Sequence, residues 1–346
     1  MADASGLDWT APGAYEVSPG VHRIPLPLPT DGLRAVNVYC METEHGLTLI
    51  DGGWAIEPAR RDLERALASI GRHPRDITSF LVTHSHRDHY TQAVSIRREF
   101  GRAVVSLGTG DKPTIDLASS GADFPYDARL RACGAFDVAR TWGEWAGENR
   151  PVAADWQPPD RWLDGEQTLT VGSRTLQAVP TPGHTAGHFV FADHQAGVLF
   201  AGDHVLPTIT PSVGFDGAPD TLPLVDYLAS LATVRALADL RLLPAHGDVG
   251  GSTHRRIDEL LAHHEVRLAL SLQAVRAGSR TPFEVARTLP WTGRQRAFDE
   301  LGVFDAGLAV METKAHLDVL QTRAEVSREI EDGLWMYDVL PRPATD

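Results

Sequence analysis

A dense group of metal-ligand side chains lies in the stretch 83–90, which reads THSHRDHY and follows an apolar run. Three histidines and an aspartate fall within six positions. Because strand side chains alternate faces and the following loop turns them inward, His84 and His86 can converge on one ion. Asp88 and His89 can then face a second ion beside it. Imidazole nitrogens with carboxylate oxygens are ligands of zinc, and less often of iron or manganese.

Three further ligand-type side chains follow apolar, strand-like runs later in the chain. His184 stands in Thr-Pro-Gly-His, Asp203 in Ala-Gly-Asp, and His246 in Pro-Ala-His-Gly. A single histidine after a strand is more often a capping or surface residue than a ligand. Four strand ends that each deliver such a side chain make that alternative improbable.

The elements that must position these residues follow from the hydrophobic pattern. Residues 15–53 alternate β-branched or aromatic runs with turns, which predicts a meander of strands ending in a glycine turn. Apolar residues at helical spacing predict helices over 58–70 and 90–100. Strands are expected over 77–82 and 103–107. This alternation of strand and helix indicates an α/β layered domain.

The stretch from about 111 to 160 interrupts that alternation with glycine, proline and tryptophan, and we interpret it as a helical insertion. It could form one wall of a substrate pocket or pack over the sheet edge. A hairpin is expected over 167–179, followed by strands at 189–191 and 198–200. The uncharged loop 205–215 should line the substrate entrance, which favours a substrate with an apolar portion.

Composition restricts the class of protein. At 346 residues the chain exceeds the usual size of one hydrophobic core, and we expect domains over 1–252 and 253–346. The net charge of −14 disfavours nucleic acid and anionic membranes as partners. Cys40 and Cys133 lack the spacing of a metal knuckle and should be buried as small hydrophobic residues. With no basic and apolar leader and no run of about 18 apolar residues, a cytoplasmic enzyme is expected.

On these motifs the sequence resembles the metallo-β-lactamase superfamily over about residues 15–251. The HxHxDH motif stands at 84–89, and the later motifs match at His184, Asp203 and His246 in the expected order. The resemblance implies an α/β (α+β four-layer) fold, the αβ/βα sandwich. It also implies two divalent metal ions, with Zn²⁺ favoured over iron or manganese.

The resemblance further implies a role for each ligand. One ion would be held by histidines alone: His84, His86 and His184. The other would have one carboxylate of its own: Asp88, His89 and His246. Asp203 would bridge both ions, and Asp88 would also act in catalysis by orienting a metal-bridging hydroxide.

The residues around the predicted ligands suggest a branch of the superfamily and supporting roles. The aspartate at 203 favours the glyoxalase II-like branch, because members that hydrolyse β-lactams have a cysteine or no metal ligand at that strand end. The Asp-Gly-Gly turn that begins at Asp51 should support the ligand loops through hydrogen bonds. Tyr90 could donate to an oxyanion, although packing under the loop is favoured. His188 and His204 are equally compatible with supporting a ligand and with a purely structural role.

After residue 253 the pattern becomes helical and then hairpin-like. Helices are expected over 257–270, from a Thr cap at 281, and over 308–323, with a hairpin over 326–337. The order resembles the winged-helix-like C-terminal domain of β-lactamase-like 2 type hydrolases. One relative of that architecture cleaves RNA, but the acidic residues of the hairpin would repel a phosphate backbone. Closing one side of the cleft, or forming a homodimer contact, is favoured instead.

The expected function is therefore a dinuclear metal hydrolase that directs hydroxide at an ester-like carbonyl, such as a thioester or lactone, of a small molecule. A phosphodiesterase or ribonuclease using the same metals is the main alternative. A mononuclear iron sulfur dioxygenase needs one redox metal, and the complete second ligand set disfavours it. A non-catalytic binding module is disfavoured by the intact set of seven ligands.

Overall fold

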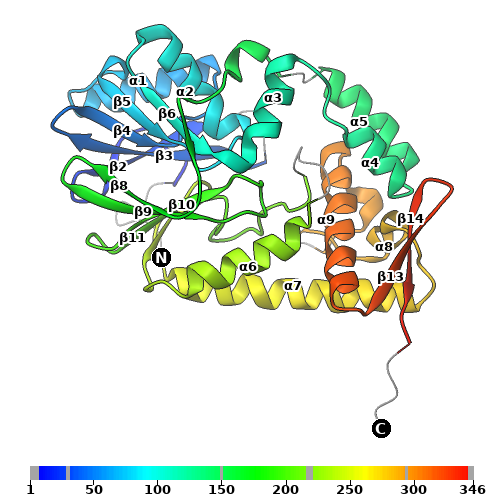
Figure 1. Ribbon diagram of the computed structural model, residues 1–346. Helices are drawn as coiled ribbons and strands as arrows, with labels where there is room; N and C mark the ends of the chain where they lie inside the picture. The colour runs from blue at the N-terminus through cyan, green and yellow to red at the C-terminus, as the bar shows by residue number, and fades with distance from the viewer. Residues whose placement is uncertain (1–7, 29–31, 149–150, 216–220, 293–294, 342–346) are drawn as a thin grey trace.

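Two β-sheets pack face to face between two layers of helices, as Figure 1 shows. The structure is a computed structural model that describes residues 8–28, 32–148, 151–215, 221–292 and 295–341. Helices cover the outer face of each of these two sheets. The arrangement is the predicted four-layer αβ/βα sandwich.

The first sheet begins as an antiparallel meander and continues as parallel strands. Its strands are β1 (Tyr15–Ser18), β2 (Val21–Pro27), β3 (Ala35–Thr43), β4 (Gly46–Ile50), β5 (Ile77–Leu81), β6 (Val104–Gly108) and β7 (Arg161–Leu163). They are ordered β1-β2-β3-β4-β5-β6-β7, and the pairs from β4 onward are parallel. Two helices, α1 (Glu57–Ser69) and α2 (Arg87–Phe100), connect β4 to β5 and β5 to β6.

Strand β3 shows how one sequence serves two cores. Val38 and Cys40 belong to the apolar cluster beneath α1 and α2, whereas Tyr39 and Met41 belong to the cluster between the sheets. Successive strand side chains point to opposite faces, so an apolar run without alternation marks a strand buried on both sides. The expectation that Cys40 is a buried, unbridged thiol is confirmed, as it is for Cys133.

The second sheet has five strands in the order β12-β11-β10-β9-β8. These strands are β8 (Gln167–Val171), β9 (Arg174–Pro180), β10 (Phe189–Asp193), β11 (Val198–Gly202) and β12 (Arg241–Pro244). All neighbours are antiparallel except β11 and β12, which are parallel. A parallel pair needs a crossover, and α6 (Pro223–Arg235) supplies it.

The predicted helical insertion consists of α3 (Lys112–Ser120), α4 (Tyr126–Ala132) and α5 (Phe136–Glu148). Its apolar residues do not form a separate core. Leu130 of α4 and Trp142 of α5 lie in the same buried cluster as Val310 of the C-terminal region. The insertion therefore lies between the sandwich and the last part of the chain.

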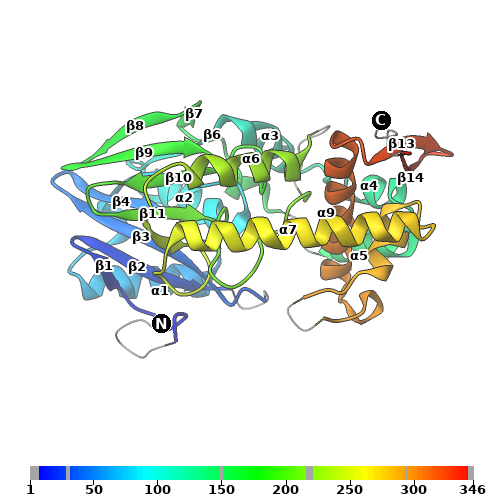
Figure 2. The ribbon, with the colours of Figure 1, turned by 90° about the horizontal axis from the view of Figure 1, so that it is seen from below.

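The C-terminal region contains α7 (Thr253–Arg276), α8 (Pro282–Thr288) and α9 (Val303–Thr322), then β13 (Val326–Glu331) and β14 (Leu334–Val339). The long helix α7 runs from beneath the second sheet to the hairpin (Figure 2). The capping box predicted at Thr281 is confirmed, since its hydroxyl accepts from the backbone N–H of Glu284. Helix α9 begins five residues before the predicted start at 308. The assignment of this arrangement to a winged helix stays a prediction.

One apolar cluster crosses the predicted domain boundary. It joins Leu199 of β11, Leu231 of α6, Leu268 of α7, Val310 of α9 and Tyr337 of β14. The helices after 253 therefore share a core with the second sheet. The division into domains at 252 and 253 stays a prediction.

None of the described helices is long and apolar enough to cross a membrane. Residues 1–7, on which the absence of a leader was inferred, lie outside the described residues.

Candidate metal centre

The predicted ligands meet at one edge of the sandwich because four strands end there. Strands β9 and β11 both run antiparallel to β10, and β12 is parallel to β11, so their C-terminal ends share an edge. His184 follows β9, Asp203 follows β11 and His246 follows β12. Strand β5 of the facing sheet delivers the stretch 83–90 to the same edge. Phe189 N–H donates to the Thr83 carbonyl (2.8 Å) and joins the two sheets there.

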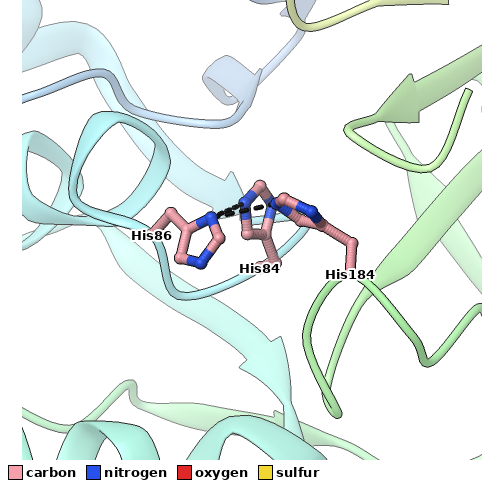
Figure 3. A group of neighbouring side chains, drawn as sticks. All are labelled: His84, His86 and His184. Carbon is pink, nitrogen blue, oxygen red and sulfur yellow. Dashed lines mark hydrogen bonds between the residues drawn. The ribbon is translucent and has the colours of Figure 1, made fainter. Parts of the chain in front are cut away.

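The first group of ligands, here called the three-histidine site, consists of His84, His86 and His184. His86 Nδ1 lies 3.0 Å from Nε2 of His84 and 3.0 Å from Nε2 of His184. Figure 3 draws the three rings converging, with these contacts as dashed lines. Two nitrogens bound at about 2.0–2.1 Å to one tetrahedral ion lie about 3.3 Å apart. Both distances are close to the spacing that one ion requires, and all three ligand atoms lie within 4.8 Å of one another.

The second group, here called the mixed site, consists of Asp88, His89 and His246. Asp88 Oδ2 lies 3.5 Å from His89 Nε2 and 3.5 Å from His246 Nε2. These three ligand atoms can also surround a single ion.

Asp203 lies between the two sites with one oxygen toward each. Its Oδ2 is 3.5 Å from His184 Nε2, in the three-histidine site. Its Oδ1 is 3.3 Å from His246 Nε2 and 3.7 Å from His89 Nε2, in the mixed site. The sharp turn that presents Asp203 depends on Gly202, because φ is +51° there and an added Cβ would lie 2.7 Å from His188 Nε2.

One expectation about this region was wrong. Asp88 and His89 were expected in a loop, with the helix beginning at Tyr90, but α2 begins at Arg87. Both ligands therefore lie in the first helical turn, where free N–H groups and the helix dipole favour an acidic side chain. His86, in extended conformation, is the residue before the helix.

Four of the five histidine ligands use their second ring nitrogen to make a hydrogen bond that fixes the ring. His84 Nδ1 contacts Thr83 Oγ1 (3.0 Å), and His89 Nδ1 contacts Asp51 Oδ2 (2.9 Å). His184 Nδ1 donates to the Ser212 carbonyl (2.7 Å), and His246 Nδ1 to the Ala35 carbonyl (2.8 Å). Because Nδ1 carries the ring proton and donates it in such a hydrogen bond, Nε2 keeps a free lone pair for a metal. The partners are Thr83, Asp51, Ser212 and Ala35.

Asp51 has the supporting role that the sequence suggested. Besides His89, its carboxylate accepts from the Thr83 N–H (2.7 Å) and the Thr83 hydroxyl (3.0 Å). One buried carboxylate thus holds both ends of the HxHxDH stretch.

The three residues with open roles all have buried side chains. Tyr90 packs near Trp156 and its hydroxyl donates to the Gln157 carbonyl (2.6 Å), so it packs under the metal loop. His188 Nε2 accepts the backbone N–H of Asp203 (3.1 Å) and supports the bridging ligand. The His204 ring contacts the rings of His188 and Tyr227.

The two sites differ in electrostatics. Burial, reinforced by the neighbouring histidines, lowers the pKa of His84 well below its ordinary value and lowers the pKa of His86 to about 3. Burial opposes charge on His89 too, but the carboxylates of Asp88, Asp51 and Asp203 outweigh it and raise the pKa of His89 to about 10. The first site therefore offers neutral imidazoles, and the second attracts positive charge.

The donor set fits divalent metal ions. Within the described part of the chain, His89 Nε2, His246 Nε2 and Asp203 Oδ1 are buried and make no hydrogen bond. Buried polar atoms without partners are costly, and a cation surrounded by these atoms would satisfy all three. The ligand types suit zinc, iron or manganese.

A cavity of about 620 Å³ opens onto the metal ligands. Seven aromatic side chains line it, of which Trp156 is one. The other six are in ring contact with one another and are here called the aromatic wall: Phe124, Tyr126, Trp142, Trp145, Phe215 and Phe304. Tyr126 and Phe215 stack at 4.0 Å between ring centroids, and Trp142 and Phe304 at 5.4 Å. The loop 205–215 lines this cavity, and so does the insertion, for which a pocket wall was one of the two roles left open by the sequence.

Sequence reasoning missed other residues of the cavity. Phe304, on α9, comes from the C-terminal region, and nothing in its local sequence marked it. Arg87, inside the motif, also lines the cavity, with its guanidinium 4.2 Å above the Trp54 ring. The position of Arg87 in the sequence, between the predicted ligands His86 and Asp88, could have indicated that it lies near the cavity.

Comparison with known proteins gives relatives that match most of the chain. It is 24% identical over 344 residues to the probable metallo-hydrolase YqjP of Bacillus subtilis, covering 92% of this chain and 97% of that protein. It is 28% identical over 284 residues to the lactamase-like protein nscB of Neosartorya fischeri, covering 78% of this chain and 70% of that protein.

Solved structures agree with the sequence relatives. A beta-lactamase domain protein from Burkholderia ambifaria superposes with a TM-score of 0.78 at 26% identity, covering 97% of this chain and 96% of that one. A metallo-beta-lactamase family protein from Thermus thermophilus superposes with a TM-score of 0.74 at 26% identity, covering 94% of this chain and 100% of that one. The sequence profile of the metallo-beta-lactamase superfamily matches residues 31–246, which include all seven predicted ligands. The chain therefore belongs to the metallo-beta-lactamase superfamily of metal-dependent hydrolases.

Proposed function

We propose that this protein is a dinuclear metal hydrolase that cleaves an ester-like carbonyl, a thioester or a lactone, in a substrate with an apolar portion. The observation that carries the proposal is the position of Asp203, whose two oxygens face the three-histidine site and the mixed site at the floor of an apolar cavity. When bound, two divalent ions would lower the pKa of a shared water and polarise a carbonyl oxygen.

The side chains around the ions would orient the reactants. Asp88 lines the cavity and is the most exposed of the carboxylate ligands, at 14%. A carboxylate at that position can accept a hydrogen bond from the attacking water and direct its lone pair toward the substrate. No serine or cysteine nucleophile is required, since a metal-bound water would supply the nucleophile, and both cysteines, Cys40 and Cys133, are buried in apolar clusters away from the cavity lining.

The lining of the cavity supports a small, partly apolar substrate over a polynucleotide. Its volume falls in the range of sites for drug-sized molecules, and the aromatic wall provides a large apolar surface. Asp123, Asp127 and Asp305 also line it, whereas Arg87 is the one arginine or lysine among the described lining residues. This balance of charge disfavours a phosphate backbone.

A hydrolytic panel on protein of known metal content tests the proposal. The panel contains thioesters and lactones with short and long acyl groups, bis(4-nitrophenyl) phosphate, single-stranded RNA and a chromogenic β-lactam. We expect turnover of thioesters or lactones with about two metals per chain. Cleavage of RNA or the phosphodiester without thioester or lactone turnover would establish the alternative function. About one iron per chain would support the dioxygenase reading.

Phe215→Ala tests the contribution of the aromatic wall to substrate choice. Removing this ring should raise KM for the long acyl substrates roughly tenfold and leave the short ones nearly unchanged, because a lost apolar contact is worth about 1–3 kcal/mol. Phe136→Ala is the matched control, since Phe136 is 52% exposed at the start of α5 and does not line the cavity. An unchanged profile in Phe215→Ala would contradict the assignment of the wall.

A further inference from the structure

Asp111, at the start of the helical insertion, lies between the two loops that form the three-histidine site. Its side chain is completely buried. Its Oδ2 accepts the backbone N–H of Ser85 (2.7 Å), and its Oδ1 accepts the backbone N–H of Gly187 (2.8 Å). The Thr185 hydroxyl donates to Oδ2 as well (3.2 Å). Ser85 lies between two ligands of the site, and Thr185 directly follows the third.

The loops are packed so closely here that few other side chains could take this place. An added Cβ on Gly110 would lie 2.2 Å from the Ala186 carbonyl oxygen, and one on Gly187 would lie 2.4 Å from the Asp111 backbone nitrogen. The turn that carries Asp111 therefore contacts the loop 185–187 through backbone atoms. The short carboxylate then reaches both loops without a bridging group.

We propose that Asp111 is a positioning residue that sets the spacing of the three-histidine site from outside the coordination shell. His84 and His86 come from the first sheet, whereas His184 comes from the second, so the distance between the sheets at this edge decides whether their nitrogens meet. Asp111 ties the backbone of one loop to that of the other. Its negative charge also favours a cation nearby.

Asp51 makes hydrogen bonds similar to those of Asp111 elsewhere in the same centre. It is likewise a buried carboxylate that accepts a backbone N–H and contacts a side chain of the ligand stretch, at the mixed site. Asp51 and Asp111 are thus both buried aspartates outside the seven predicted ligands that hold the ligand loops. Loss of such outer partners typically weakens metal affinity by about 10–100-fold.

The test is the zinc affinity of each site, measured by chelator competition, in the protein and in Asp111→Asn. The amide replaces one acceptor oxygen with a donor that faces a backbone N–H. We expect one of the two zinc-binding steps to weaken by about 10–100-fold and the other to stay within about threefold. In a His246→Ala background, which keeps the three-histidine site, Asp111→Asn should weaken the remaining zinc. In a His84→Ala background it should not.

Two further variants keep the test decisive. Thr185→Val removes a single hydrogen bond to Asp111 with little change in shape, and it should weaken the same step by a smaller factor even if Asp111→Asn fails to fold. Asp116→Asn removes a charge from an exposed position on α3 and should change neither step. Equal weakening of both steps, or no change in Asp111→Asn and Thr185→Val, would overturn the proposal. Because the readout is zinc affinity, a failure of the hydrolase assignment would leave this result unaffected.

Discussion

At the scale of single residues, four of the five histidines of the candidate centre already use their second ring nitrogen in a hydrogen bond. His184 and His246 donate to backbone carbonyls that belong to distant segments, at Ser212 and Ala35. A ring held in this way loses little conformational entropy when a metal binds. The ligand atoms that remain are Nε2 atoms facing a carboxylate, which is Asp203.

Asp203→Ala should therefore affect both metals at once. We expect zinc content to fall from about two to one or less per chain, since neither site keeps a full ligand set. The loss in kcat/KM should exceed the roughly 100-fold typical of removing an outer partner. Elemental analysis and steady-state kinetics measure the two effects. Asp116→Ala, on the exposed face of α3, is the control, and a fully loaded, active Asp203→Ala protein would contradict the bridging role.

At the scale of elements, the aromatic wall depends on close contact between α5 and α9. Gly307 lies in α9 against Trp142 of α5, and an added Cβ would lie 2.4 Å from the indole ring. Glycine inside a helix ordinarily costs about 0.5–1 kcal/mol relative to alanine. Its presence here allows the indole to approach the helix, and through Trp142 it shapes the cavity.

Gly307→Ala should for that reason destabilise the protein, against the usual trend for helices. We expect overpacking to cost about 1–3 kcal/mol in the free energy of unfolding, measured by urea denaturation. Gly143→Ala in α5 is the matched control, because no atom lies within 4 Å of its added Cβ. The free energy of unfolding of Gly143→Ala should rise by about 0.5–1 kcal/mol. Equal stabilisation of both variants would show that Trp142 moves aside at no cost.

Secondary-structure elements were predictable from the sequence where their pattern of apolar residues is contiguous and distinct. Strands β5 and β11 and the predicted ligands after them were predictable because apolar runs ending at ligand-type residues are contiguous in sequence. Helix α6 was missed. Its buried residues Leu224, Tyr227 and Leu231 recur at helical spacing, but apolar residues on its other faces obscure the pattern.

The hydrogen-bond partners of the ligands were less predictable than the ligands. Asp51 stood in a recognisable turn, whereas Asp111 lies 74 positions from Thr185 and 26 from Ser85 and belongs to no motif. The carbonyl that orients His246 lies 211 positions away. A backbone oxygen has no residue-type signal, so only the three-dimensional structure can reveal such partners.

At the scale of the whole molecule, the metal centre lies outside the hydrophobic cores. Three buried clusters stabilise the sandwich: one beneath α1 and α2, one between the sheets, and one that joins the second sheet to α7 and α9. All seven predicted ligands lie on strand ends, loops or the first turn of a helix at one edge. The fold therefore has a source of stability that does not involve metal.

Removing the metals should consequently lower stability without unfolding the protein. A ligand that binds only the native state stabilises it by about 4 kcal/mol at 1,000 times its Kd, and chelation removes that contribution. We expect the melting temperature to fall by several degrees while the far-UV circular dichroism at 25 °C stays unchanged. Zinc should restore the melting temperature, whereas calcium, which prefers six to eight oxygen ligands, should not. Loss of the circular dichroism signal on chelation would instead mean that the ions hold the two sheets together, because the apolar clusters would then be insufficient on their own.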